Sequence, residues 1–234
     1  MKRTGGSSLV AIMAAMLTLS AGAARADETV SIGGSQAALL KPASPRASVI
    51  LMPGGDGDLR VGPGGSIGSL KNNQLVRTRD AYKARGLAVL VVDAGVNLSA
   101  AVDYMRAIKS PVTVVATSRG TLRAASGIAR GARPDALVLT SGFLSDESGR
   151  DRNVIGILGS PDRLPRTLVI HHRQDGCRFT QPAGVDPFIK WAGGKARVVW
   201  LDGGNEVGNP CQAKSHHGFL GLDGKVVSLA AGFH

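Results

Sequence analysis

Six short apolar runs recur along the chain between residues 47 and 201. They occupy residues 47–52, 87–92, 112–115, 136–139, 167–170 and 197–201. Each run is continuous rather than alternating with polar residues, which is typical of strands buried on both faces of a mostly parallel sheet. Between these runs, residues 74–85, 99–109, 121–130 and 187–191 have the pattern of helices. Gly86 and Gly131 directly follow two of these segments, where helices commonly end on a glycine.

Strands that alternate with helices over short connections predict an α/β fold with a doubly wound, mostly parallel sheet and helices on both faces. Residues 27–46 are polar and contain proline, and we expect an early strand or arm there. The sequence contains no internal repeat and no interdomain linker, so residues 27–234 are predicted to form a single domain. Residues 145–165 are too few to build a substantial lid, and little or no cap domain is expected.

The first 26 residues have the three parts of a signal peptide. Lys2 and Arg3 form a basic start, residues 9–19 are an apolar run shorter than a membrane span, and residues 24–26 read Ala-Arg-Ala, with small residues at the two positions that signal peptidase reads. A retained anchor is the alternative interpretation, and no later stretch is apolar enough to cross a membrane. We therefore predict a periplasmic or secreted protein that begins near Asp27 and has no stable membrane anchor after cleavage.

The mature chain is basic. The 234-residue sequence has a formal net charge of +11, and removing three positive charges with the signal peptide leaves +8. Such a surface favours anionic partners such as lipid head groups, cell-wall polymers or acidic substrates. The basic residues are scattered and aromatic residues for stacking on bases are few, so no nucleic-acid partner is predicted.

Two cysteines, Cys177 and Cys211, are present. In an exported chain an even pair most simply forms one disulfide, which would stabilise the fold by about 2–4 kcal/mol. A metal site is not indicated, because the two cysteines do not have the C-x-x-C spacing that is typical of one.

The stretch from Pro111 to Ala125 is the outline of a strand–nucleophile–helix turn. A β-branched strand leads into Ala116-Thr117-Ser118-Arg119-Gly120, and a helical pattern follows. The small residues Ala116 and Gly120 allow the strand and helix to pass close to each other beside the serine. We predict that Ser118 is a nucleophile. The full G-x-S-x-G pattern occurs instead around Ser66, but the residues before Ser66 are VGPGG, which do not form a buried strand.

Ligands of parallel α/β sheets bind beyond the carboxyl ends of the strands. A serine, an acid and a histidine follow such ends in the order Ser118, Asp175, His217. This is the chain order of α/β-hydrolases and differs from the orders in chymotrypsin and subtilisin. A serine hydroxyl needs a histidine to take its proton, and that imidazole needs a carboxylate to fix its tautomer. We assign the roles of nucleophile, acid and base to Ser118, Asp175 and His217.

Several phrases spread over residues 47–234 carry a more specific resemblance. They are LMPGGDGDL, NNQLVRTRDAYKARGLAVLVVDA, TSRGTL, HHRQDGC, GNPC and SHHGFLG. With these phrases the sequence resembles the α/β-hydrolase family, within it the dienelactone-hydrolase-like group, and more closely a set of exported bacterial α/β-hydrolases of unassigned substrate. The resemblance implies a Ser-His-Asp esterase-like site on this fold. Ala116 departs from the family's first glycine, although the residue remains small.

An oxyanion hole is also expected. Attack on an ester carbonyl develops an oxyanion, and each preorganised N–H donor is worth about 2.7–4 kcal/mol. The donors would be the backbone amides of Gly55, in the Gly-rich turn after the first buried strand, and of Arg119, which follows the nucleophile.

Some assignments leave alternatives open. His216 is the competing base, and Asp93 is the competing acid. Cys177 lies two residues after Asp175, and Cys211 lies six residues before His217, so a disulfide between them would tie the loop of the acid to the loop of the base. His171 and His172 are expected to belong to a strand end, one packed and one exposed.

Arg77 and Arg79 are expected on a solvated helix face, with a role in holding an anionic substrate group as the alternative. Both residues precede the second apolar run and lie in a segment with a helical pattern.

The sequence thus predicts an exported serine hydrolase, an esterase that forms an acyl-enzyme from a small-molecule ester or acyl substrate and uses no metal or organic cofactor. Amide or peptide hydrolysis at the same residues is one alternative. A non-catalytic, hydrolase-like binding protein of the cell envelope is another. Substrate identity and oligomeric state are not specified by these residues.

Overall fold

A computed structural model describes residues 1–2 and 27–234, so the predicted signal peptide, apart from Met1 and Lys2, lies outside the described residues. Eight strands form the main sheet in the order β1-β2-β6-β3-β7-β8-β9-β10. Strands β6, β3, β7, β8, β9 and β10 are parallel, and β2 pairs with β6 in the antiparallel sense. The strands are β1 (Glu28–Ile32), β2 (Ser35–Leu40), β3 (Ala47–Met52), β6 (Leu87–Val92), β7 (Val112–Thr117), β8 (Ala136–Thr140), β9 (Arg166–His172) and β10 (Ala196–Leu201).

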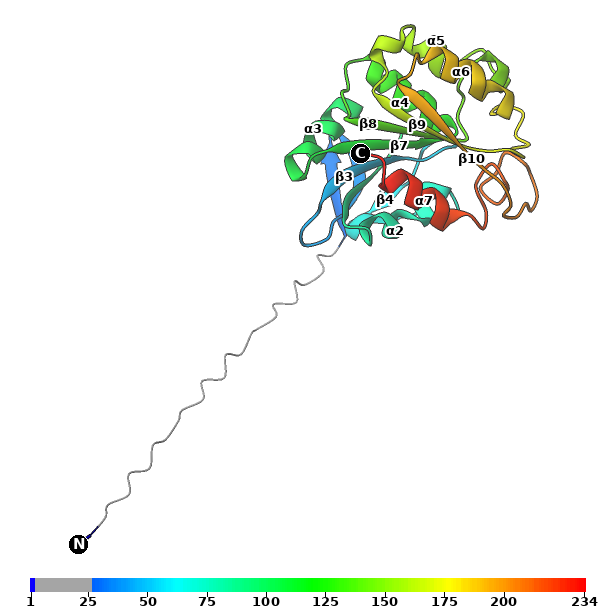
Figure 1. The fold of residues 1–234 in the computed structure, drawn as a ribbon. Coiled ribbons are helices and arrows are strands. Elements are labelled where there is room, and N and C mark those ends of the chain that lie inside the picture. The colour runs from blue at the N-terminus through cyan, green and yellow to red at the C-terminus, as the bar shows by residue number, and fades with distance from the viewer. Residues whose placement is uncertain (3–26) are drawn as a thin grey trace.

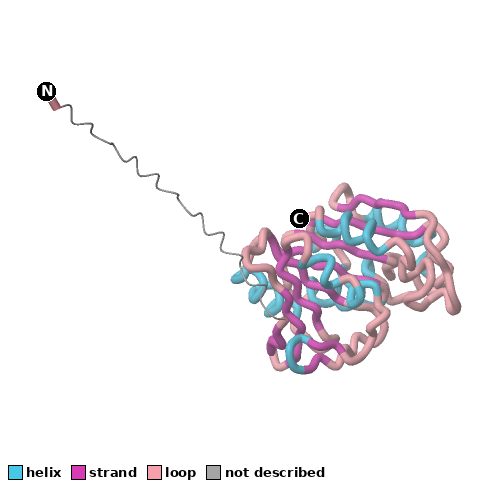
Figure 2. Tube along the Cα trace, turned by 90° about the horizontal axis from the view of Figure 1, so that it is seen from below, coloured by secondary structure: helices cyan, strands magenta, loops and turns pink. Residues whose placement is uncertain are grey.

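Helices cover both faces of this sheet (Figures 1 and 2). One core cluster joins the sheet to α3 (Leu98–Ile108), α4 (Arg119–Ala129), α5 (Val154–Leu158) and α6 (Val185–Trp191). The other joins its opposite face to α1 (Gln74–Arg77), α2 (Arg79–Lys83) and α7 (Asp223–Ala231). Because successive side chains of a strand point to opposite faces, burial on both faces explains why the central strands read as continuous apolar runs.

All six strands predicted from the apolar runs are present, and the predicted α/β architecture is confirmed. The expected early strand or arm is a hairpin, in which β1 and β2 pair in the antiparallel sense. The predicted helix over residues 74–85 is instead two short helices. They meet at Thr78, whose φ of −105° and ψ of 2° leave the helical region and whose hydroxyl donates to the carbonyl oxygen of Gln74 at 2.6 Å.

Two further small elements extend the Gly-rich segment after β3. Strands β4 (Val61–Gly62) and β5 (Ser66–Ile67) form a separate hairpin around a 3₁₀ turn at Pro63–Gly65. Short 3₁₀ turns also occur at Asp146–Ser148, Pro161–Arg163 and Pro182–Gly184. Among the described residues, no helix has the length and apolarity needed to cross a membrane.

Because strands β6, β3, β7, β8, β9 and β10 are parallel, their carboxyl ends share one edge of the sheet. The candidate site lies at this edge.

Candidate active site

Ser118 lies on a strained turn between β7 and α4. Its φ of 53° and ψ of −128° are rare for a residue with a side chain, and its backbone N–H donates to the Thr140 carbonyl oxygen at 3.0 Å. This hydrogen bond and the N-terminus of α4 hold the serine at the end of a strand whose residues are all buried. Ser118 itself is partly exposed. The strand–turn–helix geometry predicted at this serine is therefore present in the structure.

Close backbone approach explains the small residues around the turn. A Cβ on Gly120 would lie 2.2 Å from the Met52 carbonyl oxygen, and a Cβ on Gly54 would lie 2.9 Å from the Ser118 Cβ. Strand β3 and helix α4 can pass this close only without those side chains. Ala116 is fully buried, so its methyl group fits where the family pattern has glycine.

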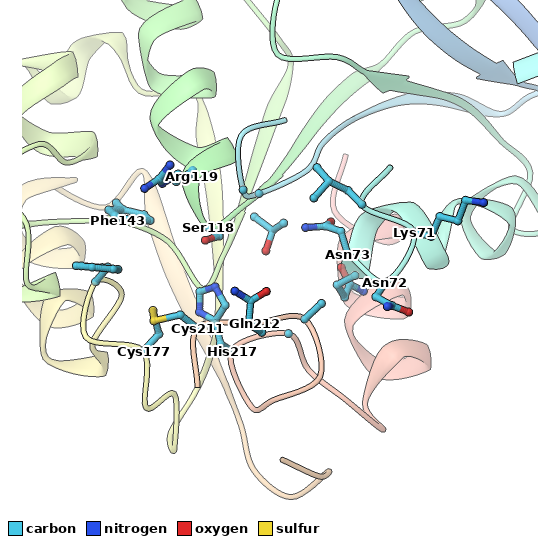
Figure 3. Close-up of a pocket in the computed structure, with 18 residues that line it drawn as sticks. Lys71, Asn72, Asn73, Ser118, Arg119, Phe143, Cys177, Cys211, Gln212 and His217 are labelled. Atoms are coloured by element: carbon cyan, nitrogen blue, oxygen red, sulfur yellow. A yellow bond between two sulfur atoms is a disulfide. The ribbon is translucent and has the colours of Figure 1, made fainter. Parts of the chain in front are cut away.

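A cavity of ≈ 480 Å³ opens beside this turn (Figure 3). Ser118, His217 and the two cysteines contribute to its wall, together with loops that follow β3, β8, β9 and β10. Asn72, Asn73 and Gln212 add polar groups, while Leu70, Phe143 and Phe179 add apolar surface. The mixture suits a small ligand with both a polar and an apolar part.

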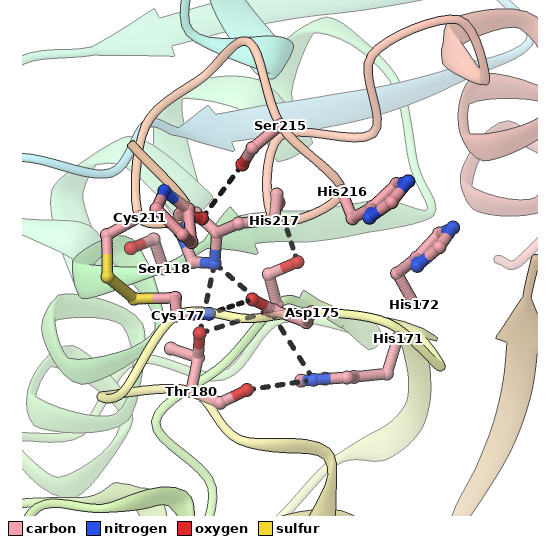
Figure 4. Close-up of polar contacts among 12 residues, drawn as sticks. Ser118, His171, His172, Asp175, Cys177, Thr180, Cys211, Ser215, His216 and His217 are labelled. Carbon is pink, nitrogen blue, oxygen red and sulfur yellow. Dashed lines mark hydrogen bonds and ion pairs between the residues drawn. A yellow bond between two sulfur atoms is a disulfide. The ribbon is translucent and has the colours of Figure 1, made fainter. Parts of the chain in front are cut away.

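His217 and Asp175 meet at the edge of this cavity (Figure 4). His217 Nδ1 lies 3.1 Å from Asp175 Oδ2, and both residues are buried. Thr180 completes the arrangement: its hydroxyl donates to Asp175 Oδ2 at 3.1 Å and lies 3.0 Å from His217 Nδ1. Because an ionised carboxylate can only accept hydrogen bonds, the neutral imidazole of His217 carries its proton on Nδ1, which faces Asp175 Oδ2. Nε2 is then left as a proton acceptor.

No hydrogen bond joins the Ser118 hydroxyl to His217 in the described part of the chain. Both side chains nevertheless line the same cavity, and substrate-free hydrolases often hold this contact open. The geometry therefore leaves the serine hydroxyl and the imidazole on one cavity without a direct contact between them.

Asp175 stays ionised at neutral pH. Burial raises its pKa, but the hydrogen bond and charge of His217 lower it more, and His171 and the Cys177 amide add to the lowering. The amide of Cys177 donates to Asp175 Oδ1 at 3.0 Å, so both carboxylate oxygens are occupied. A negative carboxylate fixed in this way can orient the imidazole of His217.

His171 lies beneath the acid and is neutral at pH 7. Burial lowers its pKa to about 4, although Asp175 and the Thr180 carbonyl oxygen oppose this shift. Its Nε2 donates to the Thr180 carbonyl oxygen at 2.9 Å and lies 3.5 Å from Asp175 Oδ2. The expectation that one of His171 and His172 is exposed is wrong, because both are fully buried at the end of β9.

The buried imidazole predicts acid sensitivity of the fold. An unfolded His171 has a pKa near 6.5 against about 4 in the folded protein, so the unfolded state binds more protons between these values. The stability is complete above pH 6.5 and falls as the pH decreases, by about 3 kcal/mol at pH 4. Urea unfolding of wild type and His171→Asn over this range measures the effect. Parallel pH profiles for the two proteins would contradict it.

Arg77 fixes the loop that carries His217. Its guanidinium makes two bonds to Asp223, with Nη2 and Nε at 2.8 and 2.9 Å from the carboxylate oxygens. It also donates to the carbonyl oxygens of Gly218 at 2.7 Å and Ala213 at 3.2 Å. Arg77 is therefore neither on a solvated face nor directed at a substrate, which corrects both readings of this residue. The guanidinium donates to backbone carbonyl oxygens on either side of His217, and no sequence pattern indicates such a contact.

Replacing Arg77 by methionine is expected to lower kcat roughly 10- to 100-fold, because small displacements of a catalytic group are costly. KM should change much less, since Arg77 does not line the cavity. Arg85→Met is the matched control, because exposed Arg85 uses its guanidinium on the nearby Ala81 carbonyl oxygen. Equal kcat for the two variants at a temperature where both are folded would contradict this role.

The predicted disulfide joins Cys177 to Cys211. It links the loop of Asp175 to the loop of His217, 34 residues apart, and both cysteines line the cavity. A second tie comes from Ser141, whose hydroxyl donates to the His217 carbonyl oxygen at 2.7 Å. The histidine loop is thus attached to the sheet at several points.

The competing residues have other partners. His216 stacks on His172 with ring centroids 4.4 Å apart, and its Nδ1 lies 3.2 Å from Glu206. Asp93 accepts from the Leu59 amide at 3.1 Å and so holds the Gly-rich segment. Ser66 is exposed on the short strand β5 and does not line the cavity. The structure brings none of these three to the cavity.

The Gly-rich turn after β3 faces Ser118. Gly55 has a φ of 63°, which favours glycine, and it lines the cavity together with Arg119, the first residue of α4. Arg123 holds this turn from behind by donating to the carbonyl oxygens of Pro53 and, at 3.3 Å, Gly55. The N-terminus of α4 adds a positive dipole end at the same place.

Thr180, Arg123 and Gln74 were not identified from the sequence. Gln74 is buried, lines the cavity, and has neither of its amide atoms hydrogen-bonded within the described structure. Threonine, arginine and glutamine are common residues, and only the packing of distant segments assigns them to this site.

No group of three or more His, Cys, Asp and Glu side chains in residues 27–234 has an arrangement that could hold a metal ion.

Comparison with solved structures defines the fold class: the chain has the α/β-hydrolase fold. TT1662 from Thermus thermophilus aligns with a TM-score of 0.61 at 15% identity, over 88% of this chain and 95% of that one. The esterase domain of a Rhodothermus marinus protein gives 0.59 at 14%, over 88% and 98%. Dienelactone hydrolase from Anabaena variabilis gives 0.57 at 17%, over 88% and 94%. At such identities the likeness concerns the fold. No protein-family model matches the sequence, and no curated protein is significantly similar to it.

Proposed function

We propose that the protein is a serine hydrolase that cleaves a carboxylic ester, with Ser118 as nucleophile, His217 as general base and Asp175 as its orienting acid. The observation that carries the proposal is the strained turn of Ser118 on the same cavity as a His217 whose Nδ1 is paired with Asp175. The esterases among the structural neighbours support it further.

In the first half of the reaction Ser118 Oγ attacks the ester carbonyl carbon, and His217 Nε2 takes the hydroxyl proton. The carbonyl oxygen becomes an oxyanion, which accepts hydrogen bonds from the backbone N–H groups of Gly55 and Arg119. Collapse of this intermediate breaks the bond to the alcohol oxygen, which receives the proton from His217. The acyl group remains on Ser118.

In the second half, water attacks the acyl-enzyme and gives its proton to His217. The second oxyanion uses the same N–H donors, and its collapse releases the carboxylic acid as Ser118 regains its proton. Every proton movement passes through His217, whose positive form is stabilised by the ionised Asp175.

Export is part of the proposal. Disulfides persist in oxidising compartments such as the periplasm or the cell exterior. The Cys177–Cys211 disulfide therefore supports export. The basic start and apolar run at residues 2–19 remain the sequence signal for secretion.

A panel of 4-nitrophenyl esters and 4-nitroanilides of equal acyl length tests the reaction class on the disulfide-bonded protein of residues 27–234. The proposal predicts ester turnover at least about 10²-fold above that of the matched anilides. Preferential anilide turnover would favour the amidase alternative, and no turnover by the folded protein would favour the binding protein.

A further inference from the structure

A second cavity adjoins the Ser118 turn on the side of helix α4. Its volume is ≈ 290 Å³, and Arg119 lines both this cavity and the one that contains Ser118. The buried side chains of Met52, Val96 and Leu98 contribute apolar surface to it. Figure 3 shows Arg119 beside Ser118, on the side of the site away from Lys71 and Asn72. The two cavities therefore share Arg119 as a wall residue and lie on neighbouring sides of it.

Among the described residues that line this second cavity, four are arginines and none is acidic. Arg119, Arg123 and Arg130 come from α4 and its C-terminal end, and Arg152 comes from the segment before α5. Over residues 27–234, the guanidinium groups of Arg119, Arg130 and Arg152 make no hydrogen bond or ion pair. By contrast Arg77 is paired with Asp223.

The protein compensates only part of the positive charge in this basic pocket: Asp56 and Asp93 act on Arg123, whereas the exposed Arg119, Arg130 and Arg152 have no acidic partner among the described residues. Burial lowers the pKa of Arg123, and Arg119 adds to the lowering, whereas Asp56 and Asp93 offset only part of it. Arg119 and Arg123 are spaced i, i+4 on α4, where like charges destabilise a helix. A bound anion would relieve this repulsion and would be held by planar guanidinium groups, which bind carboxylate and phosphate oxygens in pairs.

We propose that the basic pocket binds a carboxylate or phosphate group of the substrate, so that the preferred ester is an anionic one. This inference rests on the serine hydrolase function proposed above. Ester cleavage occurs at Ser118 while the anionic end of the same molecule lies among Arg119, Arg130 and Arg152.

Two carboxylate esters test the proposal. The 4-nitrophenyl monoester of suberic acid carries its charge on the acyl part, and 8-butyryloxyoctanoate carries it on the alcohol part. Each is compared with its uncharged methyl ester by kcat/KM in wild type and in the double variant Arg130→Gln/Arg152→Gln. Lys190→Gln/Lys225→Gln is the control, because these two exposed lysines do not line either cavity and their removal lowers the net charge equally.

Wild type is expected to prefer at least one anionic ester over its methyl ester by roughly tenfold, and this preference should disappear in the arginine variant but not in the lysine variant. Turnover of all four esters without a charge preference, or an equal loss in both variants, would overturn the inference while leaving the hydrolase function intact. If the folded protein cleaves none of them, the proposed function fails instead. Calorimetric titration with inorganic phosphate then decides on the pocket: binding lost only in the arginine variant supports it, and equal or no binding contradicts it.

Discussion

His217→Asn is expected to lower kcat by about 10⁴-fold or more, because removal of the base leaves only the oxyanion donors and substrate binding. His216→Asn is the matched control, since its neighbouring imidazole stacks on His172 and faces Glu206 rather than the cavity. It should keep kcat within roughly threefold of wild type. Steady-state ester hydrolysis at pH 7.5 by both variants measures the difference, and a larger loss in His216→Asn would reverse the assignment.

Asp175→Asn is expected to lower kcat roughly 10³–10⁴-fold. An amide in this position can donate a hydrogen bond to His217 Nδ1, which then holds the wrong tautomer and presents a proton to Ser118 instead of a lone pair. It also removes the negative charge that stabilises the imidazolium. KM should change little, because Asp175 does not line the cavity.

Asp93→Asn serves as the control for the acid. Asp93 lies after β6 and accepts one hydrogen bond from the Leu59 amide, which an asparagine oxygen can also accept. Its kcat should remain close to that of wild type. A loss of kcat in Asp93→Asn as large as that in Asp175→Asn would show that the acid has been wrongly assigned.

The fold could be predicted from the sequence because its central strands are buried on both faces. Short continuous apolar runs such as residues 87–92 and 112–115 are typical of strands that are buried on both faces, and all six runs form strands. The helix over residues 74–85 was predicted as one piece because its apolar pattern continues through Thr78. At the break, Thr78 has non-helical φ and ψ angles and its hydroxyl donates to the Gln74 carbonyl oxygen, and a periodic pattern records neither feature.

The proposed catalytic residues could be found because each follows a strand or precedes a distinctive turn. Ser118 and Asp175 closely follow β7 and β9, and His217 lies in the long loop after β10; the parallel topology brings these three strand ends to one edge of the sheet. The supporting groups could not be found in this way. Thr180 and Arg77 act through contacts across 37 and 141 residues of sequence, and nothing local distinguishes them from surface residues.

The disulfide was predicted from the number of cysteines, and its position has a further consequence. Because it joins the acid loop to the histidine loop, it lies within the wall of the cavity rather than at a distant edge.

The arginines of the basic pocket contributed to the predicted net charge, but their positions could not be predicted. Residues 119 and 152 come together only through the packing of α4 against α5.

Fluorophosphonate labelling with intact-mass detection shows whether Ser118 is an activated nucleophile, because the probe reacts with the serine hydroxyl itself. Purified protein of residues 27–234 is labelled in parallel with Ser118→Ala and Ser66→Ala, after circular dichroism has confirmed that all three are folded. We expect one phosphonyl group on wild type and on Ser66→Ala, and none on Ser118→Ala. An unlabelled wild-type protein, or a label that persists in Ser118→Ala and disappears in Ser66→Ala, would contradict it.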